Sequence, residues 1–251
     1  MVKSSRDIVK VTVLGCAGSF FDEGLRNPCS SYLVESAEAA ILLDCGFGAF
    51  ESYLAHAPDA VIDAIFVSHA HADHVADLEA FMDSAEVWRD RPRILASPET
   101  MAHIAPNEAA IPEGTLACVT SGIRWKLSTI DCEFSRTTHK MPTLAACVFI
   151  GGRRVVYCAD TGPTWVVPRK FVGADLAMVE CTLEVRNADS SPFHLDAQEA
   201  GLLAHKLSAH QTLITHVPPN EEGGARLSIA QANASMLALR LATVGLQVVL
   251  E

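Results

Sequence analysis

The chain has 251 residues, enough for one large α/β domain, and its 49% hydrophobic and 20% charged residues exclude a disordered or fibrous protein. Its formal charge is −11, with no basic block anywhere. Binding to a phosphate backbone depends on clustered Lys and Arg, so a large nucleic-acid partner is disfavoured. A small anionic substrate remains open, because bound divalent ions would supply positive charge locally.

No secretory signal or membrane segment is expected. The N-terminus lacks a long apolar stretch, and nothing approaches the ~20 unbroken apolar residues of a membrane span. Eight cysteines are scattered without a Cys-x-x-Cys pair, several of them inside apolar runs. Free cysteine behaves as a small buried hydrophobe, whereas a zinc knuckle or a redox pair has closer spacing. We therefore expect a reduced, cytoplasmic protein.

Apolar runs alternate with helical patterns along the chain. The predicted strands are 8–15, 31–35, 39–44, 63–68, 93–97, 115–119, 130–138, 144–150, 154–159, 174–180, 211–215 and 246–250. The predicted helices are 47–57, 74–84, 98–105, 164–171, 196–209 and 228–244. Asp196 and Ser228 are the predicted N-caps of the last two, and Gly151-Gly152 marks a tight hairpin. Consecutive strands followed by strand–helix alternation predict two sheets covered by helices on their outer faces.

The stretch His69-Ala70-His71-Ala72-Asp73-His74 places four potential metal ligands within six residues, directly after the apolar run 64–67. Such a run predicts a buried strand that ends at a loop, where ligands can converge without helical spacing. Imidazole and carboxylate are ligands of first-row metals. Helical spacing afterwards predicts that Asp73 and His74 begin a helix. The alternative is an exposed histidine-rich loop, which rarely has this density with an interleaved aspartate.

His139, Asp160 and His216 repeat this pattern, because each directly follows a predicted strand. Sites in α/β sheets form beyond the carboxyl ends of strands, so these residues are expected along one edge. Each alone would more often be structural, but together they complete a set for two metal ions. The predicted set is His69, His71 and His139 for one ion, Asp73, His74 and His216 for the other, and Asp160 as a bridge.

Here the chain resembles the metallo-β-lactamase fold superfamily, whose His-x-His-x-Asp-His motif stands intact at residues 69–74. The resemblance also covers, in order, residues 13–19, 42–46, His139, 160–162, 194–195 and 213–216. It implies one hydrolase domain over residues 1–251, of the α/β class. The implied fold is a four-layer αβ/βα sandwich of two mixed sheets, with helices outside and metals in a groove at one edge. The motif is specific for the superfamily and says little about substrate.

Residues 27–34 and 191–200 resemble more closely the branch that contains ribonuclease Z and bacterial cyclic-nucleotide phosphodiesterases. In that branch a histidine precedes a helix in the stretch before the last ligand, and His194 stands there. The resemblance implies that His194 is a catalytic acid that protonates a leaving alkoxide. The alternative is a structural residue at the start of a helix.

The chain departs from ribonuclease Z between His139 and Asp160, where members that process tRNA carry a long protruding arm. A single hairpin fills this interval, so tRNA is not the expected substrate. Zinc β-lactamases have Cys where Asp160 stands, which disfavours β-lactam hydrolysis. Diiron oxidoreductases of the superfamily usually have Glu in place of His71, which disfavours redox chemistry.

Asp44 ends a predicted strand, and two interpretations remain open: it orients a ligand histidine, or it initiates a turn. Residues 15–19 could direct backbone N–H groups toward a phosphate, but plain turn geometry is favoured. The remaining histidines of interest lie outside the pattern and are expected at surface or packing positions: His56, His103, His205 and His210.

The leading hypothesis is a dinuclear metal-dependent phosphodiesterase that acts on a small substrate, above all a cyclic nucleotide. A hydroxide held by two divalent ions attacks phosphorus, Asp73 orients it and accepts its proton, and His194 donates to the leaving ribose oxygen. Zinc is the expected metal, and the same donors accommodate manganese or iron.

Other hypotheses use the same residues. Ester, thioester or lactone hydrolysis needs an identical ligand set, so only His194 and its context favour a phosphodiester. An inactive binding protein is disfavoured because the ligand set is complete. The oligomeric state is not determined by the sequence, and a homodimer is one option.

Overall fold

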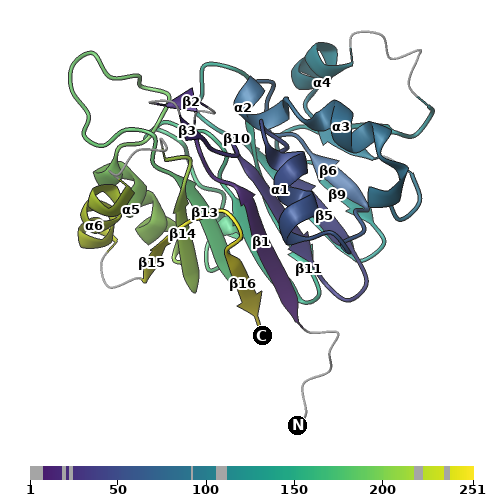
Figure 1. The fold of residues 1–251 in the computed structure, drawn as a ribbon. Coiled ribbons are helices and arrows are strands. Elements are labelled where there is room, and N and C mark those ends of the chain that lie inside the picture. The colour runs from purple at the N-terminus through teal and green to yellow at the C-terminus, as the bar shows by residue number, and fades with distance from the viewer. Residues whose placement is uncertain are drawn as a thin grey trace.

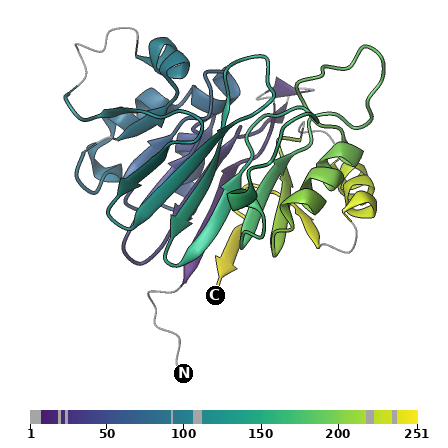
Figure 2. The ribbon, with the colours of Figure 1, turned by 180° about the vertical axis from the view of Figure 1, so that it is seen from behind.

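The computed structural model describes residues 8–18, 21–22, 25–91, 93–105, 112–217, 223–234 and 238–251. Within these ranges two seven-stranded mixed sheets pack face to face, and helices cover their outer faces (Figure 1 and Figure 2). A small ribbon of β2 (Phe21–Asp22) and β3 (Leu25–Arg26) forms a separate two-stranded sheet. The predicted four-layer αβ/βα sandwich is confirmed.

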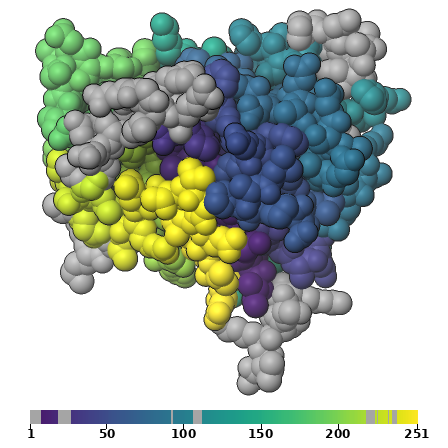
Figure 3. All heavy atoms as spheres, in the orientation of Figure 1, coloured from purple at the N-terminus to yellow at the C-terminus, as the bar shows by residue number. Residues whose placement is uncertain are grey.

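The first sheet has the order β16-β1-β4-β5-β6-β7-β8, antiparallel from β16 to β5 and parallel from β5 to β8. Its strands are β1 (Val9–Gly15), β4 (Ser31–Glu35), β5 (Ala40–Leu43), β6 (Ala64–Phe66), β7 (Ile94–Ala96), β8 (Leu116–Cys118) and β16 (Gln247–Leu250). The last strand of the chain thus pairs with the first. Figure 3 shows this C-terminal strand in yellow on the same face as the blue helix α1 (Ala49–His56).

The second sheet has the order β15-β14-β13-β12-β11-β10-β9, antiparallel from β9 to β12 and parallel from β12 to β15. Its strands are β9 (Arg124–Leu127), β10 (Ile130–Arg136), β11 (Leu144–Ile150), β12 (Arg153–Tyr157), β13 (Leu176–Glu180), β14 (Gln211–Thr215) and β15 (Leu239–Leu241). Gly151 and Gly152 have φ values of 52° and 75°, as a two-residue hairpin loop requires. The expected hairpin between His139 and Asp160 is therefore confirmed.

The central core lies between the two sheets. Phe66 of the first sheet meets Phe134 of the second with ring centroids 5.1 Å apart, and Val11 and Val148 belong to the same buried cluster. The outer faces are buried too, under helices. Strands β6 and β13 are therefore buried along their whole length, which explains why they are apolar runs without alternation.

The remaining helices are α2 (Ala72–Val75), α3 (Leu78–Asp83), α4 (Pro98–Ile104), α5 (Ala197–Leu207) and α6 (Gly223–Asn233). Asp196 caps α5 as predicted: its carboxylate accepts the Glu199 N–H, and the Glu199 carboxylate accepts the Asp196 N–H. No helix in the described ranges is long and apolar enough to cross a membrane. All eight cysteines are free.

The helix predicted at 164–171 is wrong, because only a 3-10 turn at Arg169–Phe171 forms there. Pro168 fixes its own φ and disfavours helical geometry in the residue before it. Trp165 and Phe171 instead pack edge to face, with ring centroids 6.1 Å apart, in the cluster that covers the outer face of the second sheet.

The helix predicted at 228–244 is also wrong at both ends. Helix α6 begins at Gly223, and Ser228 is not its N-cap but lies inside it, where its hydroxyl donates to the Gly224 carbonyl. Residues 239–241 form β15 beside β14, a pairing between distant segments that local periodicity does not indicate. The predicted helix 74–84 is divided into α2 and α3. Strand β9, the β2–β3 ribbon and the 3-10 turn at Ala85–Val87 were not predicted, and the other elements are confirmed to within two residues.

The crossing of α5 and α6 gives a prediction about stability. A Cβ at Gly201 would lie 2.2 Å from the carbonyl oxygen of Ala230, so Gly201→Ala must push the helices apart. We expect the free energy of unfolding to fall by about 1–3 kcal/mol in a denaturant titration. Gly224→Ala is the matched control, because a Cβ there meets nothing within 4 Å. It should be neutral or stabilise by up to about 1 kcal/mol. Equal stability of the two variants would contradict the close crossing.

Candidate metal centre

Polar side chains at the carboxyl ends of strands from both sheets converge at one edge of the sandwich. Asp160 follows β12, His216 follows β14, and the 69–74 stretch follows β6. The structure brings the seven predicted ligands together in two groups, within each of which the potential ligand atoms lie within 4.8 Å of one another. One group contains His69, His71, His139 and Asp160, and the other contains Asp73, His74 and His216.

In the first group the ring nitrogens face one another. His69 Nε2 lies 2.9 Å from His71 Nδ1, which is 3.3 Å from His139 Nε2. Asp160 Oδ2 lies 3.6 Å from His69 Nε2 and 3.8 Å from His139 Nε2. This half of the centre therefore presents three imidazoles and one carboxylate oxygen to a common point.

The second group has more carboxylate character. His74 Nε2 and His216 Nε2 lie 3.2 Å apart, and Asp73 Oδ2 lies 3.2 Å from His216 Nε2. The other oxygen of Asp160, Oδ1, lies 3.2 Å from His74 Nε2 and 3.3 Å from His216 Nε2. Asp160 thus directs one oxygen toward each group, which is the geometry of a bridging ligand.

Divalent cations fit this arrangement of donors. Ligand atoms around a tetrahedral ion with bonds of about 2.0–2.1 Å to nitrogen lie about 3.3 Å apart, which is close to the spacing of the facing nitrogens. Asp160 Oδ1 is buried, and although two ring nitrogens lie 3.2 Å and 3.3 Å away, no donor in the described residues reaches it with hydrogen-bond geometry. A buried polar atom normally has such a partner. Imidazole and carboxylate suit zinc, manganese and iron alike, so the donor set does not select one metal.

The first group keeps its imidazoles neutral. Burial lowers the pKa of His69 well below its usual value, with the neighbouring His74 as the next cause. Burial also lowers the pKa of His71 and of His139. Neutral imidazole is the form that binds a metal, so these rings do not need to lose a proton first.

The second group favours a positive charge. Burial alone would lower the pKa of His74, but the carboxylates of Asp160 and Asp44 outweigh it and raise that pKa well above its usual value. Burial would also lower the pKa of His216, but Asp160 and Asp73 outweigh it and raise the pKa to about 9. Several carboxylates around buried rings therefore create a strong preference for a cation at this point.

Asp44 lies beneath the centre and orients His74. Its Oδ2 accepts hydrogen bonds from His74 Nδ1 at 2.7 Å and from the Tyr157 hydroxyl at 2.5 Å, and its Oδ1 accepts the Ser68 N–H at 2.6 Å. Donation from Nδ1 leaves Nε2 of His74 free to bind a metal. Asp44 also has a φ of 60° where the chain turns after β5, so both interpretations of this residue hold.

The backbone is strained at three points around the centre. Asp44, Ala159 and His216 have φ values of 60°, 50° and 55°, in the left-handed region that non-glycine residues rarely adopt. Such conformations cost on the order of 1–3 kcal/mol each and persist where the surrounding structure holds them. Each strained residue is itself a polar residue at the centre or directly precedes one.

The glycine turn 15–18 packs closely against neighbouring segments. A Cβ at Gly15 would lie 1.8 Å from the Cys29 carbonyl oxygen, and a Cβ at Gly18 would lie 2.7 Å from His216 Nδ1. The glycines therefore permit close approach, in agreement with the turn interpretation, and Ser19 lies outside the described residues. The other four histidines are exposed and belong to neither ligand group, as expected: His56, His103, His205 and His210.

His194 lies beside the centre. Its Nδ1 is 3.1 Å from Glu180 Oε1 and 3.9 Å from Asp160 Oδ2, and its ring stacks on His216 with centroids 5.8 Å apart. Burial would lower the pKa of His194, but the hydrogen bond with Glu180 outweighs it and raises the pKa. The side chain remains 20% exposed, so it borders the open side of the centre. Its potential ligand atom also groups with those of Asp160 and His216.

Glu180 and Thr182 are further functional candidates, which the sequence did not reveal. Buried Glu180 ends β13, where its Oε1 accepts the Thr161 N–H at 2.9 Å and its Oε2 accepts the Thr182 hydroxyl at 2.6 Å. Thr182 Oγ1 in turn lies 2.8 Å from His216 Nδ1. The two residues therefore fix the orientation of both His194 and His216. The sequence feature that could have indicated Glu180 is its position at the end of a predicted strand, where the metal ligands also lie.

Comparisons with known proteins agree with this architecture. A family model described as a beta-lactamase superfamily domain matches residues 39–217. The chain is 28% identical over 219 residues to a probable metallo-hydrolase, YhfI, of Bacillus subtilis, with 84% of this chain and 87% of the relative covered. It is 24% identical over 250 residues to a ribonuclease Z of Mycobacterium bovis, with 84% and 87% covered.

Solved structures show the same fold. The metallo-beta-lactamase fold protein YhfI from Bacillus subtilis matches with a TM-score of 0.76 at 24% identity, over 97% of this chain and 100% of that one. A diphosphatase from the PhnP family matches with a TM-score of 0.70 at 18% identity, over 96% and 97%. Yeast PDE1 matches with a TM-score of 0.69 at 13% identity, over 96% and 99%.

Proposed function

The chain belongs to the β-lactamase superfamily, and from that premise we propose that it is a metal-dependent phosphodiesterase for a small substrate, in particular a cyclic nucleotide. The observation that carries the proposal is the position of His194, which borders a His/Asp centre and is held by the buried Glu180. A phosphodiester with an alkoxide leaving group needs a proton donor at this place. Ester or lactone hydrolysis has less need of one.

In this proposal seven side chains hold two divalent cations, with zinc as the expected metal and manganese or iron as alternatives. When bound, the cations supply positive charge to phosphate oxygens and activate water for attack on phosphorus. Three of these ligands are held by neighbours: Asp44 fixes His74, Thr182 fixes His216, and the Phe193 carbonyl lies 3.0 Å from His139 Nδ1. The proposed ligands are His69, His71, Asp73, His74, His139, Asp160 and His216.

Two side chains move protons. Asp73 is the more open of the two carboxylates, with 24% of its side chain exposed against 2% for Asp160, so it orients the attacking water and accepts its proton. The Nδ1 atom of His194 is occupied by Glu180 and Thr182. Its Nε2 atom is therefore the one that donates to the departing ribose oxygen and stabilises negative charge on the phosphate.

A ribonuclease and a diphosphatase among the similar proteins support a phosphate substrate. The size of that substrate is inferred from this chain. Only the β11–β12 hairpin stands between His139 and Asp160, and the net charge of −11 opposes binding to a long polyanion. We therefore propose a small substrate and not tRNA.

An activity screen tests the proposed function. Metal-loaded protein should hydrolyse cyclic nucleotides and bis(p-nitrophenyl) phosphate, and should turn over lactones and thioesters more slowly. Chelator-treated protein is the control and should lose all of these activities. Hydrolysis of a lactone or thioester, but of no phosphodiester, would contradict the proposal and establish the alternative hydrolase.

His194→Ala tests the assigned proton donor. Turnover of a cyclic nucleotide should fall by roughly 10²–10⁴, the usual contribution of a positioned general acid. A p-nitrophenyl phosphodiester has an activated leaving group that needs little protonation, so its turnover should fall much less. Metal content should stay normal, and His205→Ala, a change at an exposed helix residue, is the matched control.

The role of His194 is decided by comparing the loss of turnover on the cyclic nucleotide with the loss on the p-nitrophenyl phosphodiester. Equal losses on both substrates would mean that the residue acts by positioning or structure. Loss of metal from His194→Ala would make the residue a ligand, as its grouping with Asp160 and His216 allows.

A further inference from the structure

A cavity of about 310 Å³ lies past the carboxyl ends of β7, β8 and β10, at the edge of the sandwich where Asp160 and His216 also follow their strands. Both sheets contribute to its walls, which include Ser97, Glu99, Thr120, Ser121, Arg136 and Leu144. None of these residues belongs to the proposed metal centre.

Backbone contacts join this cavity to the centre. Arg136 and Leu144 are paired across β10 and β11, and the Leu144 N–H donates to the carbonyl of Ser68, the residue before His69. Arg136 is three residues before His139, so their Cα atoms lie within about 10 Å. A small molecule with its phosphate at the centre can therefore place another part in the cavity.

Arg136 is directed to the cavity by strand alternation. Cys132 and Phe134 lie in the core between the sheets, and Arg136 follows at the same period of two, at the edge where the core ends. Its guanidinium lies 3.7 Å from the Glu99 carboxylate, and both side chains are about half exposed. The cavity thus offers a planar donor and an acceptor side by side.

This pair of charges determines which chemical group the cavity accepts. A second phosphate would be attracted by Arg136 but repelled by Glu99, so the net gain is small. A neutral heteroaromatic base that presents both acceptors and donors satisfies both side chains. Guanidinium donates in a fork to the O6 and N7 atoms of guanine, and a carboxylate accepts from base N–H groups. The exposed ring of Pro98 supplies an apolar wall.

We propose that this cavity binds the nucleobase of the substrate, with guanine preferred, while the phosphate lies at the metal centre. The proposal rests on the proposed function and names the part of the substrate that determines specificity. Arg136 is then a specificity residue that contacts the base.

Equilibrium binding to the metal-loaded protein tests this assignment without any need for turnover. Titration calorimetry compares guanosine 5′-monophosphate with ribose 5-phosphate, which lacks the base. The wild-type protein should bind the nucleotide on the order of tenfold more tightly, since a bidentate contact to a base is worth about that factor. Arg136→Ala should remove most of this preference. No preference in the wild type, or an unchanged preference in Arg136→Ala, would overturn the proposal.

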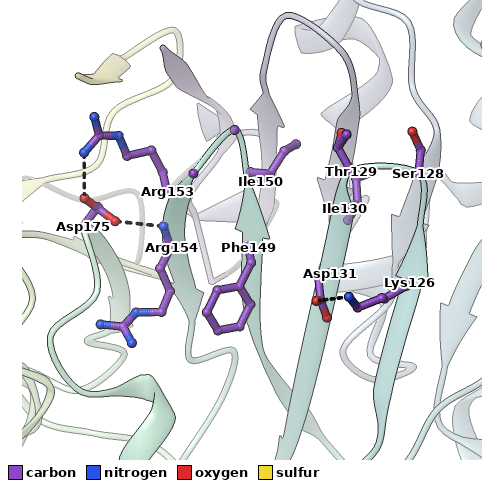
Figure 4. A pocket seen from close by; sticks show the side chains of 12 residues that line it. Lys126, Ser128, Thr129, Ile130, Asp131, Phe149, Ile150, Arg153, Arg154 and Asp175 are labelled. Carbon is purple, nitrogen blue, oxygen red and sulfur yellow. Dashed lines mark hydrogen bonds and ion pairs between the residues drawn. The ribbon is translucent and has the colours of Figure 1, made fainter. Parts of the chain in front are cut away.

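Arg153→Ala is the matched control. Arg153 also lines a cavity, of about 650 Å³, and pairs with a carboxylate, Asp175 Oδ1 at 3.4 Å, but it begins β12 at the end opposite to Asp160 (Figure 4). This variant should keep the wild-type preference for the nucleotide, and loss of the preference here too would overturn the assignment to Arg136.

The outcome separates this proposal from the proposed function. Hydrolysis of phosphodiesters without any preference for the nucleotide rejects the base site alone. A preference that depends on Arg136, in a protein that hydrolyses no phosphodiester, supports the base site and rejects the proposed function.

Discussion

The buried carboxylate of Asp160 is the group on which the rest of the centre depends. Its Oδ2 faces the His69 group, 3.6 Å from His69 Nε2, and its Oδ1 faces the His74 group, 3.2 Å from His74 Nε2. Its backbone is held in place by the Thr137 hydroxyl, which donates to the Asp160 carbonyl at 2.7 Å. Burying a charged group without compensation costs several kcal/mol or more, so this carboxylate requires positive charge around it. Cations in the two groups would supply that charge.

The scaffold stabilises this arrangement through two apolar layers and several hydrogen-bonded supports. Strands buried on both faces end together at one edge, so their first polar residues must share a small volume. Asp44, Tyr157 and Ser68 form a hydrogen-bonded support under the first sheet's histidines, and Glu180 with Thr182 forms one under the second sheet's. Both supports hold ring nitrogens in fixed orientations, which pre-organises the centre before any ligand binds.

Much of the centre was predictable because most of its ligand residues lie in short, local sequence patterns. The density of ligands at 69–74 and the strand-end positions of Asp160 and His216 indicate where the donors lie. Glu180 was missed because a lone strand-end glutamate has no local sign of its partners, Thr161 and Thr182. The helix predicted at 228–244 failed because residues 239–241 gain backbone hydrogen bonds from β14, a distant segment. At 164–171 Pro168 prevented the predicted helix.

We propose that the two groups of donors hold two cations with Asp160 between them. Anomalous diffraction from crystals of the metal-loaded protein, recorded on both sides of the metal absorption edge, measures this directly. We expect two peaks, one contacted by His69, His71 and His139 and the other by Asp73, His74 and His216, with one Asp160 oxygen on each. A single peak, or peaks bound by other side chains, would contradict it.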